Sequence, residues 1–174
     1  FIRIGGCDVG CHWCDVKESW NKNLHPLANT DTIIENAAKY AAKSVVVTGG
    51  EPLMCNLNYL CTELRKRNIK TYLETSGCYP LSGNWSWICL SPKKQNEPLA
   101  EFYKVANELK VIISKPSDFE WARACAKKVN DNCLLYFQPE WSNIKSIAPL
   151  IVSYVKENPK WCIGLQIHKY LNIP

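Results

Sequence analysis

Short apolar runs alternate along the chain with stretches that carry the helical spacing of apolar residues. This alternation favours a parallel sheet, because each return to the same edge requires a crossover connection. Polar residues gather directly after the expected strands, where active-site loops lie in barrel-like α/β proteins. About six or seven strands are too few for a closed eight-stranded barrel. We therefore predict a partial, open TIM-like barrel with mostly parallel strands, formed by Phe1–Ile4, Ser44–Thr48, Ile69–Leu73, Trp85–Leu90, Glu108–Ile113, Cys133–Phe137 and Trp161–Ile167.

The helices between these strands are predicted from apolar periodicity and from N-terminal capping patterns. Thr32 to Glu35 has capping-box spacing, and Ser117 to Glu120 repeats it. Pro149 is expected near the start of its helix, where a missing N–H is tolerated. The other predicted helices are Leu57–Leu64, Ala100–Ala106 and Ser146–Lys156.

Composition places the chain among ordinary globular proteins and excludes two function classes. Its 174 residues suit a single domain, residues 1–174, and 47% of them are hydrophobic against 21% charged. The formal net charge is +5 without a run of Lys or Arg, so a nucleic-acid-binding arm is not indicated. No stretch resembles a signal peptide or a membrane span.

Three cysteines lie within eight residues, as Cys7, Cys11 and Cys14. That spacing suits one loop around one metal centre, and thiolates select iron–sulfur clusters or zinc. A closed zinc site requires a fourth ligand nearby, and no second pair of cysteines or histidines follows. An iron–sulfur cluster with one open iron fits better, and a cluster implies a reducing cytoplasm. The remaining cysteines are read as small buried hydrophobes, on helix faces at Cys61 and Cys125 and in strands at Cys89 and Cys133.

The cysteine loop resembles the signature of radical S-adenosylmethionine (SAM) enzymes, in which an aromatic residue, here Trp13, precedes the third cysteine. In that superfamily the open iron chelates the amino and carboxylate groups of SAM. Gly49, Gly50 and Glu51 follow an expected strand and look like the GGE motif that binds the amino group of SAM.

Three further polar segments follow successive strands, beginning at Glu74, Ser91 and Gln138. Each alone could be a capped or solvated turn. Together, with FIRxGGC, TGGEP and the final QIHKYLNIP, they resemble the 7-carboxy-7-deazaguanine synthase family over the whole chain. The resemblance implies substrate contacts at Arg3, Thr75, His168 and the carboxylate of Pro174, and SAM contacts at Gly77, Ser91, Pro92, Lys93, Gln138, Pro139, Glu140 and Trp141.

The resemblance also implies the reaction. A reduced [4Fe–4S] cluster splits SAM into methionine and a 5′-deoxyadenosyl radical, and the radical takes hydrogen from C6 of 6-carboxy-5,6,7,8-tetrahydropterin. The ring contracts, ammonia leaves, and 7-carboxy-7-deazaguanine forms in the queuosine and deazapurine pathway. An electron donor such as flavodoxin or ferredoxin and a homodimer are further expectations.

Two departures from the family pattern concern Mg²⁺ and the N-terminus. The family often has a threonine that ligates Mg²⁺ where this chain has Val16, so the expected Mg²⁺ dependence is weaker or indirect. The family's N-terminal substrate-binding segment is expected to lie before Phe1. Two alternatives share the loop: a glycyl-radical-enzyme activase, which would act on a protein, and a non-catalytic zinc-binding module.

Overall fold

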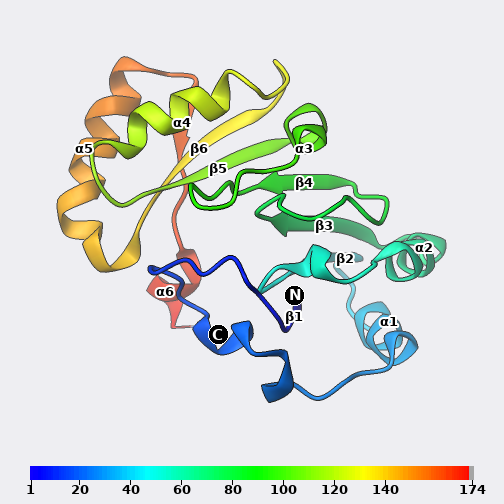
Figure 1. Ribbon diagram of the computed structural model, residues 1–174. Coiled ribbons are helices and arrows are strands. Elements are labelled where there is room, and N and C mark those ends of the chain that lie inside the picture. Colours follow the sequence, from blue (N-terminus) through cyan, green and yellow to red (C-terminus); the bar gives the residue numbers. More distant parts are fainter. Residues whose placement is uncertain (173–174) are drawn as a thin grey trace.

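Seven parallel strands form one open sheet in the order in which they occur along the chain (Figure 1). The computed structural model describes residues 1–172. Within them β1 and β7, the two edge strands, do not pair, so the barrel stays open as predicted. The strands are β1 (Ile2–Ile4), β2 (Ser44–Gly49), β3 (Lys70–Thr75), β4 (Trp87–Leu90), β5 (Glu108–Ile113), β6 (Leu134–Pro139) and β7 (Trp161–Ile163).

The described residues also form six α-helices and four short 3₁₀ turns, all but α6 lying between strands. None of these helices is both long and apolar enough to cross a bilayer. The helices are α1 (Thr30–Ala38), α2 (Asn58–Lys66), α3 (Ala100–Val105), α4 (Asp118–Ala126), α5 (Ile144–Glu157) and α6 (Ile167–Leu171). The 3₁₀ turns are η1 (Lys17–Trp20), η2 (Lys22–Leu24), η3 (Pro52–Met54) and η4 (Trp141–Asn143).

The two faces of the sheet differ in polarity. In β5, Leu109 and Val111 are fully buried, whereas the intervening Lys110 and Ile112 are only half-buried. A parallel sheet covered by helices on both faces would show a continuous apolar run instead. Lys110, Ile112 and, from β3, Glu74 line a cavity, so the concave face of the sheet is the open and polar one.

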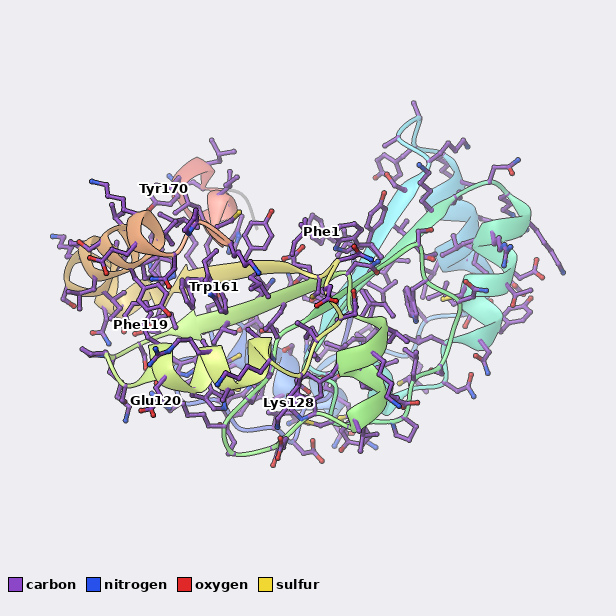
Figure 2. The ribbon with its side chains drawn as sticks, turned by 90° about the horizontal axis from the view of Figure 1, so that it is seen from above. Phe1, Phe119, Glu120, Lys128, Trp161 and Tyr170 are labelled. Atoms are coloured by element: carbon purple, nitrogen blue, oxygen red, sulfur yellow. The ribbon has the colours of Figure 1, made fainter. Side chains whose placement is uncertain are left out.

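The convex face carries the core. Leu73, Leu90 and Phe137 are fully buried there, and each such side chain contributes about 1.5–3 kcal/mol relative to an exposed one. At the β6–β7 end, Phe137 stacks on Trp161 with ring centroids 3.8 Å apart and meets Phe119 of α4 edge-on. Figure 2 shows Phe119 and Trp161 at this end of the molecule. The cysteines predicted to be buried are so: Cys61, Cys89, Cys125 and Cys133.

Both predicted capping boxes are wrong. Helix α1 begins at Thr30, and Asn29 caps it by accepting a hydrogen bond from the N–H of Asp31 at 2.8 Å. At α4, Ser117 makes no capping bond. Asp118 instead accepts hydrogen bonds from the N–H groups that precede the helix, and its carboxylate is almost fully buried. Short polar side chains at neighbouring positions compete for the same N–H groups, so spacing alone does not locate the cap.

The predicted strand Trp161–Ile167 is also wrong in its second half. Strand β7 ends at Ile163, and Gly164 makes one further bond to the carbonyl of Phe137 at 2.8 Å. The last pair with β6 is Phe137 with Ile163, and Pro139 at the end of β6 has no N–H with which to continue the ladder. It turns into α6, which places His168 on a helix. Helix α5 starts earlier than predicted and holds Pro149 in its interior.

Candidate active site

A cavity of about 520 Å³ lies against the concave face of the sheet at the carboxyl ends of the strands. Its volume falls in the range of small-molecule sites. The loop between β1 and η1, the turns after β2, β3 and β4, and the start of α6 all contribute to its wall. Most of the predicted site residues line it: Arg3, Cys7, Cys11, Trp13, Cys14, Gly49, Gly50, Glu51, Thr75, Ser91, Lys93, Gln138 and His168.

The cysteine loop is held against the turn after β2 by backbone hydrogen bonds. The N–H of Gly50 donates to the carbonyl of Ile4 at 2.9 Å, and that of Glu51 donates to Gly6 at 2.8 Å. A Cβ at Gly50 would lie 2.1 Å from the carbonyl oxygen of Gly6, and one at Gly49 would lie 2.1 Å from that of Ile4. Gly49 also has φ of +140°, which favours glycine. The two glycines therefore allow the close backbone approach that packs the loop onto the sheet.

The three thiols of the loop line the cavity and are the kind of donor set that an iron–sulfur cluster requires. Across residues 1–172, no three His, Cys, Asp or Glu side chains are arranged to hold one metal ion. A [4Fe–4S] cluster makes a different demand, because each thiolate binds a different iron. Burial raises the pKa of Cys7 and Cys11 in the metal-free chain, so bound iron would have to stabilise their thiolates.

Glu51 is almost fully buried, at 2% exposure, and its carboxylate is engaged with the turn after β3. It accepts hydrogen bonds from Thr75 Oγ1 at 2.6 Å and from Ser76 N at 2.8 Å and Oγ at 2.5 Å. The N–H of Leu53 donates to the same carboxylate at 3.2 Å. A carboxylate has about four acceptor sites. Glu51 and Thr75, predicted for SAM and substrate respectively, thus also hold each other in place at the cavity wall.

Lys93 lies between the turn after β4 and the cysteine loop. Its Nζ donates to the carbonyl of Ser91 at 2.5 Å and to Ser91 Oγ at 2.7 Å. The same ammonium lies 5.3 Å from the ring centroid of Trp13, a cation–π contact that ties the two segments together. Burial lowers the pKa of Lys93.

Five predicted SAM residues do not line the cavity: Gly77, Pro92, Pro139, Glu140 and Trp141. Gly77 has φ of +77° and accepts a hydrogen bond from Leu99 N at 2.9 Å. The Glu140 carboxylate caps η4 by accepting from Ser142 N at 2.8 Å. Trp141 packs edge-on against Tyr170 of α6, which Figure 2 labels. Pro174 lies outside the described residues.

Sequence reasoning missed two charged pairs at the cavity. Lys110 Nζ lies 3.2 Å from Glu74 Oε1, across the concave face of the sheet. Burial would lower the pKa of Lys110, but the carboxylates of Glu74, its hydrogen-bond partner, and of Glu108 outweigh burial and raise that pKa. The available signal was a lysine within the apolar strand Glu108–Ile113.

The second missed pair joins the cysteine loop to α6. Asp15 accepts a hydrogen bond from Gln166 Nε2 at 2.5 Å and lies 3.5 Å from Lys169 Nζ. The Nε2 of His168 lies 3.9 Å from the same carboxylate. Figure 1 shows α6 next to the N-terminal loop, although the two are at opposite ends of the sequence. No local pattern predicts such a contact, since it depends on how the sheet curves.

An open parallel barrel with a three-cysteine loop and a GGE turn at its mouth is the arrangement of a radical SAM protein, and the Radical SAM superfamily model matches residues 1–87. A 7-carboxy-7-deazaguanine synthase from Flavobacterium psychrophilum is 59% identical over all of this chain and 82% of its own length. A 7-carboxy-7-deazaguanine synthase from Synechocystis is 45% identical over 99% of this chain and 83% of its own length. The chain belongs to the 7-carboxy-7-deazaguanine synthase family.

The fold agrees with a solved structure of the same family. The crystal structure of QueE from Escherichia coli superposes with a TM-score of 0.79 at 25% identity, covering 94% of this chain and 83% of that one. The predicted fold class is therefore confirmed. Membership in the radical SAM superfamily implies a [4Fe–4S] cluster and SAM as cofactors.

Proposed function

We propose that this chain converts 6-carboxy-5,6,7,8-tetrahydropterin to 7-carboxy-7-deazaguanine by radical ring contraction with loss of ammonia, in queuosine and deazapurine biosynthesis. The observation that carries the proposal is that the cysteine loop, the GGE turn, Arg3 and His168 all face one cavity. Relatives that cover the chain from end to end bear the name of this synthase.

Cys7, Cys11 and Cys14 hold the cluster in this proposal. A bound [4Fe–4S] cluster supplies an electron for the reductive cleavage of SAM. Three thiolates leave one iron without a protein ligand, and that vacancy is what SAM requires. Gly49 and Gly50 let the cysteine loop pack closely beside this position, and the ammonium of Lys93 lies over the Trp13 ring of the same loop. These residues position SAM and exclude water from it.

Arg3 and His168 orient the carboxypterin. Arg3 pairs across β1 and β2 with Thr48, and its side chain reaches the cavity from the open edge of the barrel. A guanidinium binds a carboxylate with two parallel N–H bonds, which fixes direction as well as distance. Thr75 is proposed as a further substrate contact, with its hydroxyl already oriented by Glu51.

Several further features complete the proposal. Mg²⁺ binds less directly than a threonine ligand would allow, because the side chain of Val16 at the cavity wall carries no oxygen. The electron comes from a flavodoxin or ferredoxin. The protein acts in the cytoplasm as a homodimer. Residues 1–174 form one radical SAM domain, which the single sheet supports.

The test is anaerobic reconstitution with iron and sulfide, followed by incubation with carboxypterin, SAM and dithionite. The proposal expects 7-carboxy-7-deazaguanine by absorbance and mass, and none from the Cys11→Ala variant. SAM cleavage without the deazaguanine would assign the radical to another substrate, as in an activase. Zinc in place of iron and sulfide in anaerobically purified protein would indicate the binding module.

A further inference from the structure

Two thiols of the cysteine loop, those of Cys11 and Cys14, have a side-chain N–H group directed at their sulfur. The indole Nε1 of Trp20 lies 3.3 Å from Cys14 Sγ, and the amide Nε2 of Gln95 lies 3.5 Å from Cys11 Sγ. Both donors are side chains, so both can be varied by substitution.

Trp20 is fixed in place from both its backbone and its ring. Its carbonyl accepts a hydrogen bond from the N–H of Cys7 at 3.1 Å, while its indole reaches Cys14 at the other end of the loop. The carbonyl of the preceding residue, the buried Ser19, accepts from Gly6 N at 2.7 Å. The 3₁₀ turn η1 therefore presents the indole N–H to the loop as part of a fixed backbone connection.

Gln95 reaches the loop from a part of the chain that is remote in sequence. It lies in the connection after β4, in a tight turn in which the N–H of Asn96 donates to Lys93 at 3.2 Å. Its amide donates to the carbonyl of Val9 at 3.3 Å as well as to Cys11 Sγ. Two neighbouring acceptors on the loop thus orient one NH₂ group.

We propose that Trp20 and Gln95 set the reduction potential of the cluster through these two N–H···S hydrogen bonds. On one-electron reduction by the donor, the cluster and its thiolates gain one negative charge. A donor N–H stabilises the more negative state more strongly, so each bond raises the reduction potential. The consequence is a cluster that a cellular flavodoxin-class donor can reduce, at some loss of driving force toward SAM.

The inference rests on the proposed function in one respect, namely that the cysteine loop binds a [4Fe–4S] cluster. The test therefore uses the reconstituted protein without SAM and without pterin, and follows the reduced cluster by electron paramagnetic resonance during a potentiometric titration. Trp20→Phe removes the indole N–H and keeps an aromatic ring. Gln95→Met removes the amide and keeps the length of the side chain. Trp85→Phe is the matched control, because its indole donates to the carbonyl of Ser82 at 2.8 Å and to no cysteine.

Trp20→Phe and Gln95→Met are each expected to bind the full amount of iron and sulfide and to have a more negative midpoint potential than the parent. The double variant is expected to shift the potential further, since the two donors bond to different sulfurs. Trp85→Phe is expected to match the parent. Full clusters with unchanged potentials in both variants would overturn the proposal. A parent protein that takes up no cluster at all would instead overturn the proposed function.

A second measurement tests the hydrogen bond from Trp20 to Cys14 if Trp20→Phe does not retain its cluster. In the parent protein with ¹⁵N-labelled indoles, the hydrogen bond predicts a ¹⁵N hyperfine coupling to the reduced cluster. The coupling should persist in Trp85→Phe. Its absence from the labelled parent, together with an unshifted potential in Gln95→Met, would contradict the inference.

Discussion

The carboxylate of Glu51 accepts hydrogen bonds from both the N–H and the hydroxyl of Ser76, and so joins the turn after β2 to the turn after β3. Both turns belong to the cavity wall. The parallel register that sets Val47 opposite Leu73 brings them to the same level of the barrel. Glu51 is therefore a structural support of the site, whatever it also contributes to SAM.

Glu51→Gln is expected to lower the free energy of unfolding by roughly 2–4 kcal/mol. The amide replaces one acceptor oxygen with a donor NH₂ group that faces other donors, and each buried donor left without a partner costs about 1–3 kcal/mol. Urea denaturation of the cluster-free chain measures the change. Glu63→Gln is the control, because Glu63 pairs with Lys66 and Arg67 on the surface of α2, where such ion pairs contribute little to stability. Equal losses in the two variants would contradict the buried role.

Alanine at Cys7, Cys11 or Cys14 is expected to abolish both the iron chromophore and SAM cleavage. The reason is that two thiolates leave two irons without a protein ligand. Iron and sulfide analysis after anaerobic reconstitution measures the loss. Cys55→Ala and Cys162→Ala remove exposed thiols away from the cavity and should keep the full cluster. A complete cluster in Cys11→Ala would refute the ligand assignment.

Local sequence patterns predicted the strands well and the contacts between them poorly. The run Glu108–Ile113 is a strand with those same bounds, because its alternation reports one buried and one open face. The predicted strand Trp161–Ile167 was too long, because the length of a strand also depends on the neighbouring strand that pairs with it. The fit of Thr75 to Glu51, or of Gln95 to Cys11, depends on residues brought together by sheet register. Motifs therefore located the cavity, while its hydrogen bonds depend on contacts between residues that are far apart in the sequence.

The lowered pKa of Asp118 predicts that the folded protein loses stability in acid. Its burial would raise the pKa, but the ammonium of Lys94 and the N–H groups of Ser114 and Lys115 outweigh burial and hold the pKa of Asp118 below its ordinary value. A depressed pKa in the folded state adds stability above the unfolded pKa of about 3.9, and that stability is lost as the pH falls through the folded pKa. Urea midpoints of the cluster-free chain from neutral pH down to about pH 3 should therefore fall less steeply in Asp118→Asn than in the parent. Asp131→Asn, at an exposed position, should follow the parent curve. Parallel curves for Asp118→Asn and the parent would contradict this role.

Val16→Thr is expected to strengthen the response of the enzyme to Mg²⁺. Val16 lines the cavity two residues after Cys14, and its hydrocarbon side chain offers no ligand, whereas Mg²⁺ binds oxygen almost exclusively. Threonine has nearly the same shape as valine, so the added hydroxyl is the main change. Titration of the rate of deazaguanine formation with Mg²⁺ should show half-saturation at a lower concentration in the variant than in the parent. Val16→Ala is the control, because it alters the side chain without adding oxygen and should leave the half-saturating concentration where the parent has it. A parent enzyme that already responds to Mg²⁺ as strongly as Val16→Thr would show that the ion is bound without help from this position.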